Sequence, residues 1–149
     1  MTYDSTEDTK DHIDLVRGYL RRVADNIDRR AKHHDESKLA EPEKSGFDII
    51  RPRLDKDDIE SDEYRRTLHD FDAVLRHHYD HNSHHPEHYP NGIAGMSLFD
   101  LTEMICDWAA ASQRKPGGTL NLDWAKKRFG ISDQLDSIMR NTAKEMGWF

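Results

Sequence analysis

The stretch DHIDLVRGYLRRVADNIDRR, residues 11–30, decides the fold class. Its apolar residues recur at spacings of three and four, which is the period of a helix with one apolar face. A half-buried strand would instead alternate apolar and polar residues, and no segment of the sequence sustains that alternation. We therefore predict an all-α protein. The residues that form the stripe are Ile13, Val16, Leu20, Val23 and Ile27.

Helix start and stop signals predict the elements that follow. Pro42 and Pro52 interrupt residues 35–58, which predicts a short helix and then a loop. Ser61 is a good N-cap, and the helix that it opens is predicted to run to about Asn82. These signals add two helices to the one at residues 11–30.

The C-terminal third carries clearer signals. Ser97 and Asp100 form a capping box that opens a helix over residues 98–113. Gly130 separates two short helices near 121–129 and 133–146. The sequence therefore predicts a single compact domain of about five to six helices over residues 11–149, preceded by a flexible N-terminus at residues 1–10.

Composition limits the function. The 149 residues carry a formal net charge of −7, which disfavours a surface for duplex nucleic acid because such a surface needs clustered Lys and Arg. The only cysteine in the sequence, Cys106, excludes a disulfide framework and is predicted to be a small buried hydrophobe. There is no signal-peptide core and no apolar run that could span a bilayer. We expect a soluble, cytoplasmic protein without a membrane partner, and homo-oligomerisation stays open.

The segment HHYDHNSHHPEHYPNG, residues 77–92, has six histidines in twelve positions. Histidine is the commonest metal ligand among side chains, so this segment predicts a metal site. At 100° per residue, His78 and Asn82 fall on the apolar face of their helix, whereas His77 and His81 lie outside it. If the helix frays before Asn82, His81 replaces His78 as the ligand. The sequence does not choose between His84 and His85.

Other candidate ligands lie elsewhere in the chain. His12 is beside the apolar stripe of the first helix, and the dyad His34–Asp35 follows the end of that helix. Asp107 lies within the apolar run EMICDWAA, where a carboxylate is costly unless it is paired or coordinated. Asn82 is suited to orienting a ligand from the second layer of the site.

The order of these candidates resembles the ligand order of the HD-domain metal-dependent phosphohydrolases, whose ligands follow the pattern H, HD, H, HH, D. The segment HDESK also looks like the HD-x-x-K form of that superfamily, in which the lysine, here Lys38, faces the phosphate. The segment HHPEHYPNG loosely resembles elements of the HD-GYP branch, but no GYP follows. The resemblance implies a helical HD-like domain with these metal ligands: His12, His34, Asp35, His78, His84, His85 and Asp107.

A closer resemblance rests on three blocks: HDESKLAEPEKSGF, HHYDHNSHHPEHY and MSLFDLTEMICDWAAAS. They look like those of a family of short bacterial and phage proteins. That family supplies no substrate.

Imidazoles and carboxylates suit one or two divalent ions such as Mn, Fe, Co, Ni or Zn, and Asp35 could bridge two of them. Such a centre activates water for attack on phosphorus, so we expect hydrolysis of a small phosphate ester, most simply in a nucleotide. Lys38 and Asp35 are the expected catalytic residues, and Glu41, Glu87 or His88 assists the leaving group. The expected contacts to substrate come from Lys38, Glu41, His81, Asn82 and His88. Two alternatives stay open: a di-iron oxygenase, and a non-enzymatic, metal-stabilised nucleotide-binding protein of a phage-like genome.

Overall fold

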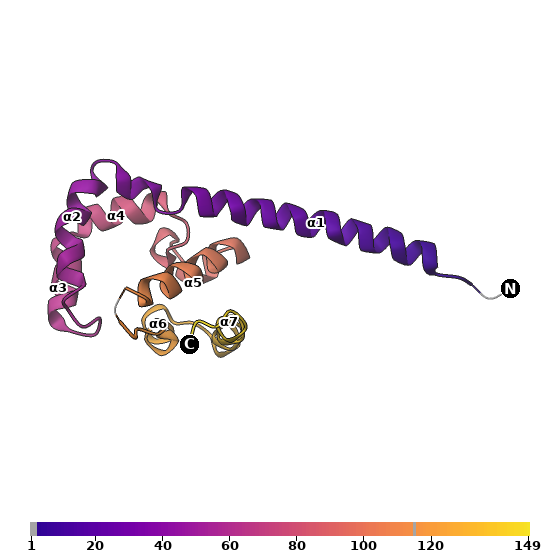
Figure 1. The fold of residues 1–149 in the computed structure, drawn as a ribbon. Helices are drawn as coiled ribbons and strands as arrows, with labels where there is room; N and C mark the ends of the chain where they lie inside the picture. Colours follow the sequence, from indigo (N-terminus) through magenta and orange to yellow (C-terminus); the bar gives the residue numbers. More distant parts are fainter. Residues whose placement is uncertain (1–2, 115) are drawn as a thin grey trace. The chain divides into compact units, whose positions relative to one another are not determined.

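The computed structural model describes residues 3–114 and 116–149 and is all-helical, as predicted. Within these residues there are seven α-helices and three short 3-10 helices, and there is no strand. The chain divides into two compact units, Met1–His34 and Asp35–Phe149. The α-helices in chain order, labelled in Figure 1, are α1 (Thr6–His33), α2 (Glu43–Leu54), α3 (Asp62–Asp70), α4 (Asp72–His81), α5 (Leu98–Ser112), α6 (Leu122–Phe129) and α7 (Asp133–Glu145).

The first unit consists of α1, a helix of 28 residues. The helix starts at Thr6, which is earlier than the predicted start near Asp11, and so takes in half of the segment predicted to be flexible. Glu7 and Asp8 in the first turn favour this earlier start, because acidic side chains stabilise the positive end of the helix dipole. Met1 and Thr2, the first part of the predicted flexible segment, lie outside the described residues.

The second unit begins with the 3-10 helix η1 (Glu36–Leu39), followed by α2, α3 and α4. Helix α2 packs against η1, α3 and α4. The prediction of one helix from Ser61 to Asn82 was wrong, because the chain bends at Phe71 into two helices. Phe71 has a backbone conformation of φ −112° and ψ 21°, and neither glycine nor proline marks the bend in the sequence. The predicted N-cap is confirmed, since the Ser61 side chain accepts a hydrogen bond from the Tyr64 backbone N–H.

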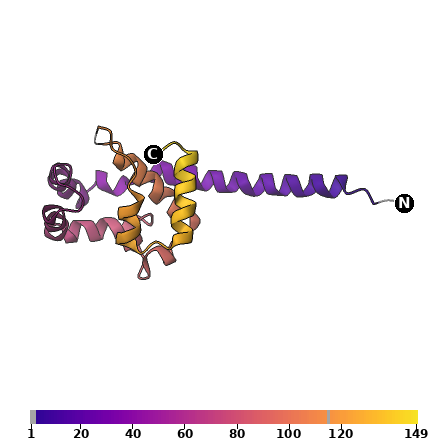
Figure 2. The ribbon, with the colours of Figure 1, turned by 90° about the horizontal axis from the view of Figure 1, so that it is seen from below.

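Helices α5, α6 and α7 enclose the main hydrophobic cluster, and Figure 2 shows α6 and α7 side by side in orange and yellow. The capping box of Ser97 and Asp100 is present, and Gly130 ends α6 in the left-handed conformation at φ 63°. The Trp108 and Phe129 rings stack at 5.5 Å between centroids beside the cluster. The buried members of the cluster are Met104, Ile105, Leu120, Leu122, Ala125, Ile131, Met139 and Ala143.

The structure tests the expectation that Cys106 is buried. Cys106 is exposed, so that prediction was wrong. It follows Met104 and Ile105 on α5, and each further residue turns the side chain by about 100°, which carries position 106 away from the core.

In residues 3–114 and 116–149, no helix has both the length and the apolar character needed to cross a membrane.

Candidate metal centre

Four side chains of the second unit converge on one point: Asp35, His78, His84 and His85. Asp35 precedes η1, His78 lies in the last turn of α4, and His84 and His85 lie in the loop after it. One ligand atom from each residue lies within 4.8 Å of one ligand atom from every other. His78 and His84 are each only 1% exposed. The prediction that His78 points inward is therefore confirmed.

The separations match those of atoms that share one metal ion. The Nε2 atoms of His78 and His85 are 2.9 Å apart, and the Asp35 Oδ1 atom is 3.4 Å from His78 Nε2 and 3.5 Å from His84 Nε2. Metal bonds to imidazole nitrogen and carboxylate oxygen are about 2.0–2.2 Å long, so ligand atoms lie about 3.0 Å apart at a right angle and about 3.4 Å apart at a tetrahedral angle. These three separations therefore fit a coordination shell, and the remaining pairs of ligand atoms lie within 4.8 Å.

Glu43 of α2 fixes the orientation of the His78 ring. The Glu43 side chain is fully buried, and His78 Nδ1 donates to its Oε2 atom over 2.8 Å. His77 Nδ1 donates to the other oxygen, Oε1, also over 2.8 Å. Because the Nδ1–H of His78 is used in this way, its Nε2 lone pair faces Asp35 and His85. A buried carboxylate behind an imidazole is the usual second layer of a metal site.

A short chain of hydrogen bonds indicates which ring nitrogen of His78 carries the proton. The amide nitrogen of Asn82 lies 2.8 Å from the His78 carbonyl oxygen and 2.8 Å from Ser37 Oγ, so these two acceptors use both of its hydrogens. Ser37 Oγ in turn donates to Glu43 Oε2 over 2.9 Å. Asn82 therefore has no proton left for His78 Nδ1, which keeps its own proton and donates it to Glu43. The orienting role of Asn82 stays a prediction, and its contacts here are to the His78 carbonyl and to Ser37.

His84 has an equivalent partner on α5. Its Nδ1 atom lies 3.2 Å from Glu103 Oε1, while its Nε2 atom faces Asp35. In both residues Nδ1 lies beside a carboxylate of another helix and Nε2 lies near Asp35. Two carboxylates from two helices hold the two buried imidazoles with their Nε2 atoms directed at one point.

Burial favours the neutral form of two of the imidazoles, His78 and His85. Burial is the main cause that lowers the pKa of His78, and the nearby charge of Lys38 lowers it further, against the opposing effects of Asp35 and Glu43. Burial also places the pKa of His85 far below its usual range, with His84 and His78 adding to the effect. Burial alone would raise the pKa of Glu43, but hydrogen bonds from His77, Ser37 and His78 outweigh it and leave that pKa lowered. A neutral His78 and a neutral His85 beside an ionised Glu43 are in the protonation states that a cation needs.

Lys38 adds a positive charge at the edge of the cluster. Its Nζ atom forms an ion pair of 2.6 Å with Asp35 Oδ2 and lies 4.9 Å from the centre of the Phe47 ring. The side chain of Lys38 as a whole is 29% exposed. Oδ2 of Asp35 thus faces Lys38, while Oδ1 faces the histidines.

Asp107 of α5 adjoins the same centre. One of its carboxylate oxygens lies within 4.8 Å of an oxygen of Asp35, and its negative charge opposes the lowering of the His85 pKa. The structure therefore brings together five of the seven predicted metal ligands. Of the other two, His12 is exposed on α1 and His34 is the last residue of the first unit, and both stay predictions.

The predicted substrate contacts are mostly engaged elsewhere. His81 Nδ1 donates to the His77 carbonyl oxygen over 2.7 Å, and its ring stacks on that of His77. His88 Nδ1 donates to the Tyr79 carbonyl oxygen over 2.7 Å. Glu41 is exposed and accepts from Ser45 Oγ over 2.6 Å, while Glu87 forms an ion pair of 3.2 Å with Arg128. None of these four side chains belongs to the cluster of Asp35 and the three histidines.

Sequence reasoning did not predict the three residues that contact the ligands or their partners from behind: Ser37, Glu43 and Glu103. Glu43 lies in the polar segment EPEKSG, and nothing in the neighbouring sequence indicates that this acid is buried. Glu103 was visible as part of the acidic spacing Asp100, Glu103, Asp107 on α5. That pattern is more often a solvated edge, but here it borders the histidines.

The chain was compared with families and with individual proteins. A family model described as a family of unknown function, DUF5662, matches residues 1–145. No curated protein and no solved structure matches the chain. Since the family model covers nearly the whole length, the chain belongs to the DUF5662 family.

Proposed function

We propose that this protein is a divalent-metal-dependent phosphohydrolase acting on a small phosphate ester, most simply a nucleotide. The observation that carries the proposal is the cluster of Asp35, His78, His84 and His85, which have the separations of atoms around one ion. The carboxylates Glu43 and Glu103 behind two of the imidazoles support it, because a carboxylate behind a ligand imidazole is the usual second layer of a metal site.

The donor set selects the kind of metal. Three imidazoles and one carboxylate suit borderline divalent ions such as Mn, Fe, Co, Ni and Zn, and fit poorly the all-oxygen environment that Mg²⁺ and Ca²⁺ prefer. When bound, such an ion acts as a Lewis acid that activates water near neutral pH. Asp107, next to Asp35, offers a further carboxylate if a second ion is held.

Lys38 is the residue that favours a phosphate over a neutral substrate. It pairs with Asp35 Oδ2 and has no lone pair for a metal while protonated, so its charge is available to an anion beside the ion. In phosphoryl transfer, a fixed positive charge stabilises the negative charge on the non-bridging oxygens. The acidic net charge of the chain makes a small substrate more suitable than a nucleic-acid duplex.

The proposal is tested by elemental analysis of the untagged protein, followed by a screen of nucleotides for phosphate release with each of the five metals. His85→Ala and Asp35→Ala are expected to lower bound metal to well under half of the wild-type amount. His69→Ala is the matched control, because its side chain is 91% exposed on α3 and takes no part in the cluster. Circular dichroism reports whether each variant keeps its helices.

The possible results separate the candidate functions. The proposal is supported if the wild type and the control variant contain metal, both cluster variants lose it, and the wild type releases phosphate. Bound iron with O₂ consumption and no phosphate release would replace it with the oxygenase. Bound metal with intact nucleotide after long incubation would leave a binding protein, and equal metal content in all variants would refute the site.

A further inference from the structure

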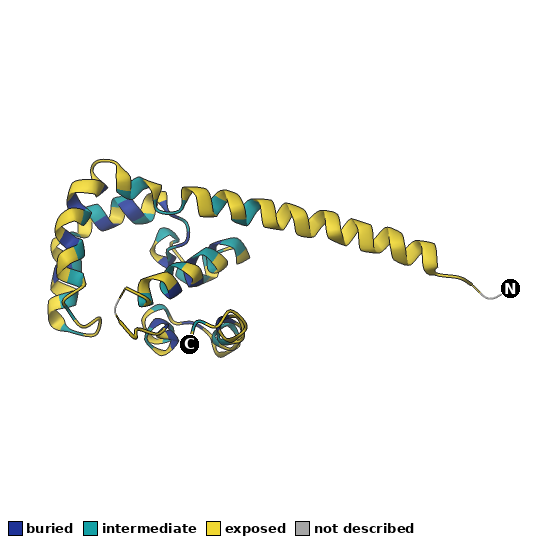
Figure 3. Cartoon of the chain, in the orientation of Figure 1, coloured by how far each residue is buried: buried dark blue, intermediate teal, exposed yellow. Residues whose placement is uncertain are grey.

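A cavity of about 340 Å³ lies between the ends of α2 and α5 and the first turns of α3 and α6. All of its lining residues belong to the second unit, and none is one of the four residues of the metal cluster. Figure 3 shows half-buried segments, in teal, on both α3 and α5. Sites for small molecules have volumes of about 300–1,000 Å³, so the cavity has the size needed for a small molecule or for part of one.

Three aromatic side chains line the cavity: Tyr64 of α3, Trp108 of α5 and Trp124 of α6. The two indoles are held in place by Phe129, which is not part of the lining. Its ring stacks on Trp108 at 5.5 Å between centroids and meets Trp124 edge-on at 6.2 Å. The cavity therefore has aromatic surfaces in fixed positions, and a planar ring can stack on such surfaces.

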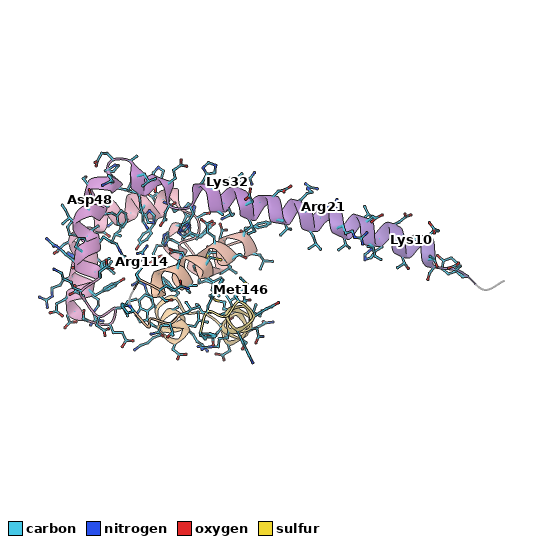
Figure 4. The ribbon with its side chains drawn as sticks, in the orientation of Figure 1. Lys10, Arg21, Lys32, Asp48, Arg114 and Met146 are labelled. Atoms are coloured by element: carbon cyan, nitrogen blue, oxygen red, sulfur yellow. The ribbon has the colours of Figure 1, made fainter. Side chains whose placement is uncertain are left out.

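The charged side chains of the lining carry both signs. Among its described residues are two arginines, Arg51 and Arg114, and three acids, Asp55, Asp57 and Asp58. Arg51 forms an ion pair with Asp55, and Figure 4 labels Arg114, which follows the end of α5. These charges give no positive excess that would attract a phosphate, but they place hydrogen-bond donors and acceptors around the aromatic rings. A neutral heteroaromatic ring, with donors and acceptors along its edge, matches this lining.

Helix α5 joins the cavity to the metal centre. Glu103 and Asp107 border the centre, and Ala111 lines the cavity. Their spacing of four residues places all three on one face of the helix, and the rise of 1.5 Å per residue puts Ala111 about 6 Å beyond Asp107. Arg51 is also near Asp107, whose charge opposes the lowering of the Arg51 pKa by burial. The cavity therefore begins about one helical turn beyond the centre, and the sugar of a nucleotide has the length to join the two.

We infer that the cavity binds a neutral heteroaromatic ring of the size of a nucleobase, as the organic part of a substrate whose phosphate lies at the metal centre. The inference rests on the proposed function for the place of the phosphate, whereas the site for the ring rests on the cavity alone. It defines the substrate class more closely: an ester that joins a heteroaromatic ring to its phosphate through a sugar-sized linker.

The first experiment measures the binding of nucleosides, which carry the ring but no phosphate, with chelator present. Adenosine, guanosine, cytidine and uridine are titrated by ligand-observed NMR against the wild type, Ala111→Phe and Ala110→Phe. The added ring at position 111 occupies the cavity, whereas Ala110 is equally exposed on α5 and does not line it. At least one nucleoside should bind the wild type and Ala110→Phe, and should bind Ala111→Phe on the order of 10-fold more weakly.

Ribose 5-phosphate, which has no base, should not bind under these conditions. The absence of nucleoside binding to the wild type at millimolar concentration, or equal affinities for the two variants, overturns the inference.

A second pair of variants decides the test if circular dichroism shows that Ala111→Phe has lost its helices. Arg114→Ala removes a donor from the lining at an exposed position, and Gln113→Ala is its control, because Gln113 is exposed beside it and does not line the cavity. Nucleoside affinity should fall about 2- to 10-fold in Arg114→Ala relative to the control, the effect of losing one hydrogen bond. Equal affinities for this pair would overturn the assignment of the cavity.

The last experiment separates the site for the ring from the phosphohydrolase proposal. With metal bound, Ala111→Phe should have a KM for the matching nucleoside monophosphate about 10-fold above that of Ala110→Phe, and a much smaller difference for glycerol phosphate, which has no ring. Phosphate release from the nucleotide with the same KM in both variants would overturn the site for the ring and leave the phosphohydrolase proposal intact. Nucleoside binding by the wild type without any phosphate release would support the site and refute that proposal.

Discussion

Glu43 accepts hydrogen bonds from His78 Nδ1 and His77 Nδ1, each over 2.8 Å, although these residues are more than thirty positions away in the chain. The contact joins α2 to α4 and at the same time fixes the ring of a candidate metal ligand. Packing of the two helices and orientation of the ligand therefore depend on the same buried carboxylate.

Glu43→Gln tests this dependence. An amide at position 43 has one oxygen instead of two equivalent acceptors, so it cannot accept from both imidazoles, and the His78 ring loses its fixed tautomer. We expect metal affinity to fall about 10- to 100-fold, the usual effect of removing a partner behind a ligand. Competition with a chromophoric chelator measures the affinity. Glu41→Gln, at an exposed position next to the same helix, should keep wild-type affinity. Equal affinities for the two variants would contradict the role of Glu43.

Lys38→Ala separates metal binding from catalysis. The variant should keep its metal, because a protonated lysine is no ligand. If the reaction is phosphoryl transfer, loss of the charge should slow turnover on the order of 10²-fold or more. Metal content, melting temperature and phosphate release are measured on the same preparation.

If Lys38 serves only as the partner of Asp35, the same variant loses at most about 1 kcal/mol of stability and keeps its activity. Full activity with full metal would remove Lys38 from the mechanism and would weaken the phosphohydrolase proposal with it.

Asp100 should make stability depend on pH. Burial would raise the pKa of this carboxyl, but hydrogen bonds from Ser97, Ser83 and Tyr89 outweigh it and hold the pKa well below its usual range. A folded-state pKa below the unfolded value of about 3.9 means that the stabilisation is complete above that pH and is lost as pH falls through the folded value. Asp100→Asn should therefore cost about 1.5–3 kcal/mol at pH 7 and progressively less below about pH 4.

Urea unfolding of the wild type and of Asp100→Asn at pH 7, 5 and 3, with chelator present, measures this difference in unfolding free energy. Asp133→Asn is the control, because that side chain is 97% exposed in the first turn of α7. A cost for Asp100→Asn that does not change between pH 7 and pH 3 would disagree with the lowered pKa.

Gly46 sets how closely α2 and α4 approach. A Cβ at this position would lie 2.6 Å and 2.7 Å from the two methyl carbons of Val74. Because valine has one strongly preferred rotamer in a helix, the clash is not easily relieved, and Gly46→Ala should cost about 1–3 kcal/mol. The double variant Gly46→Ala/Val74→Ala should recover part of that loss, as thermal unfolding can show. Gly18→Ala in α1, where the space is open, should instead stabilise its helix by up to about 1 kcal/mol.

Local sequence patterns were sufficient for most of the fold. The capping box at Ser97 and the glycine stop at Gly130 are satisfied within a few residues, so they could be read without knowing the tertiary structure. The bend at Phe71 could not, because no glycine or proline produces it. Helix α2 packs against both α3 and α4, and sequence periodicity does not contain such tertiary contacts.

The same distinction applies to the candidate site. The inward direction of His78 follows from the angle between successive helical residues and was predicted correctly. The burial of Glu43 depends on a contact with a residue 35 positions later, and its neighbours in sequence are those of a surface glutamate. The prediction could name ligands from residue type and order, but not the acids that hold them.

The cluster draws its side chains from three places: the start of η1, the end of α4 and the loop that follows. An ion held there would act as a cross-link between positions 35 and 85, which are about fifty residues apart in the chain. A free ion concentration of a hundred times the dissociation constant would raise the free energy of unfolding by about 2.7 kcal/mol. In a metal-poor cell, the folded fraction of the second unit would then fall with the supply of the ion, and the abundance of the protein would follow metal availability.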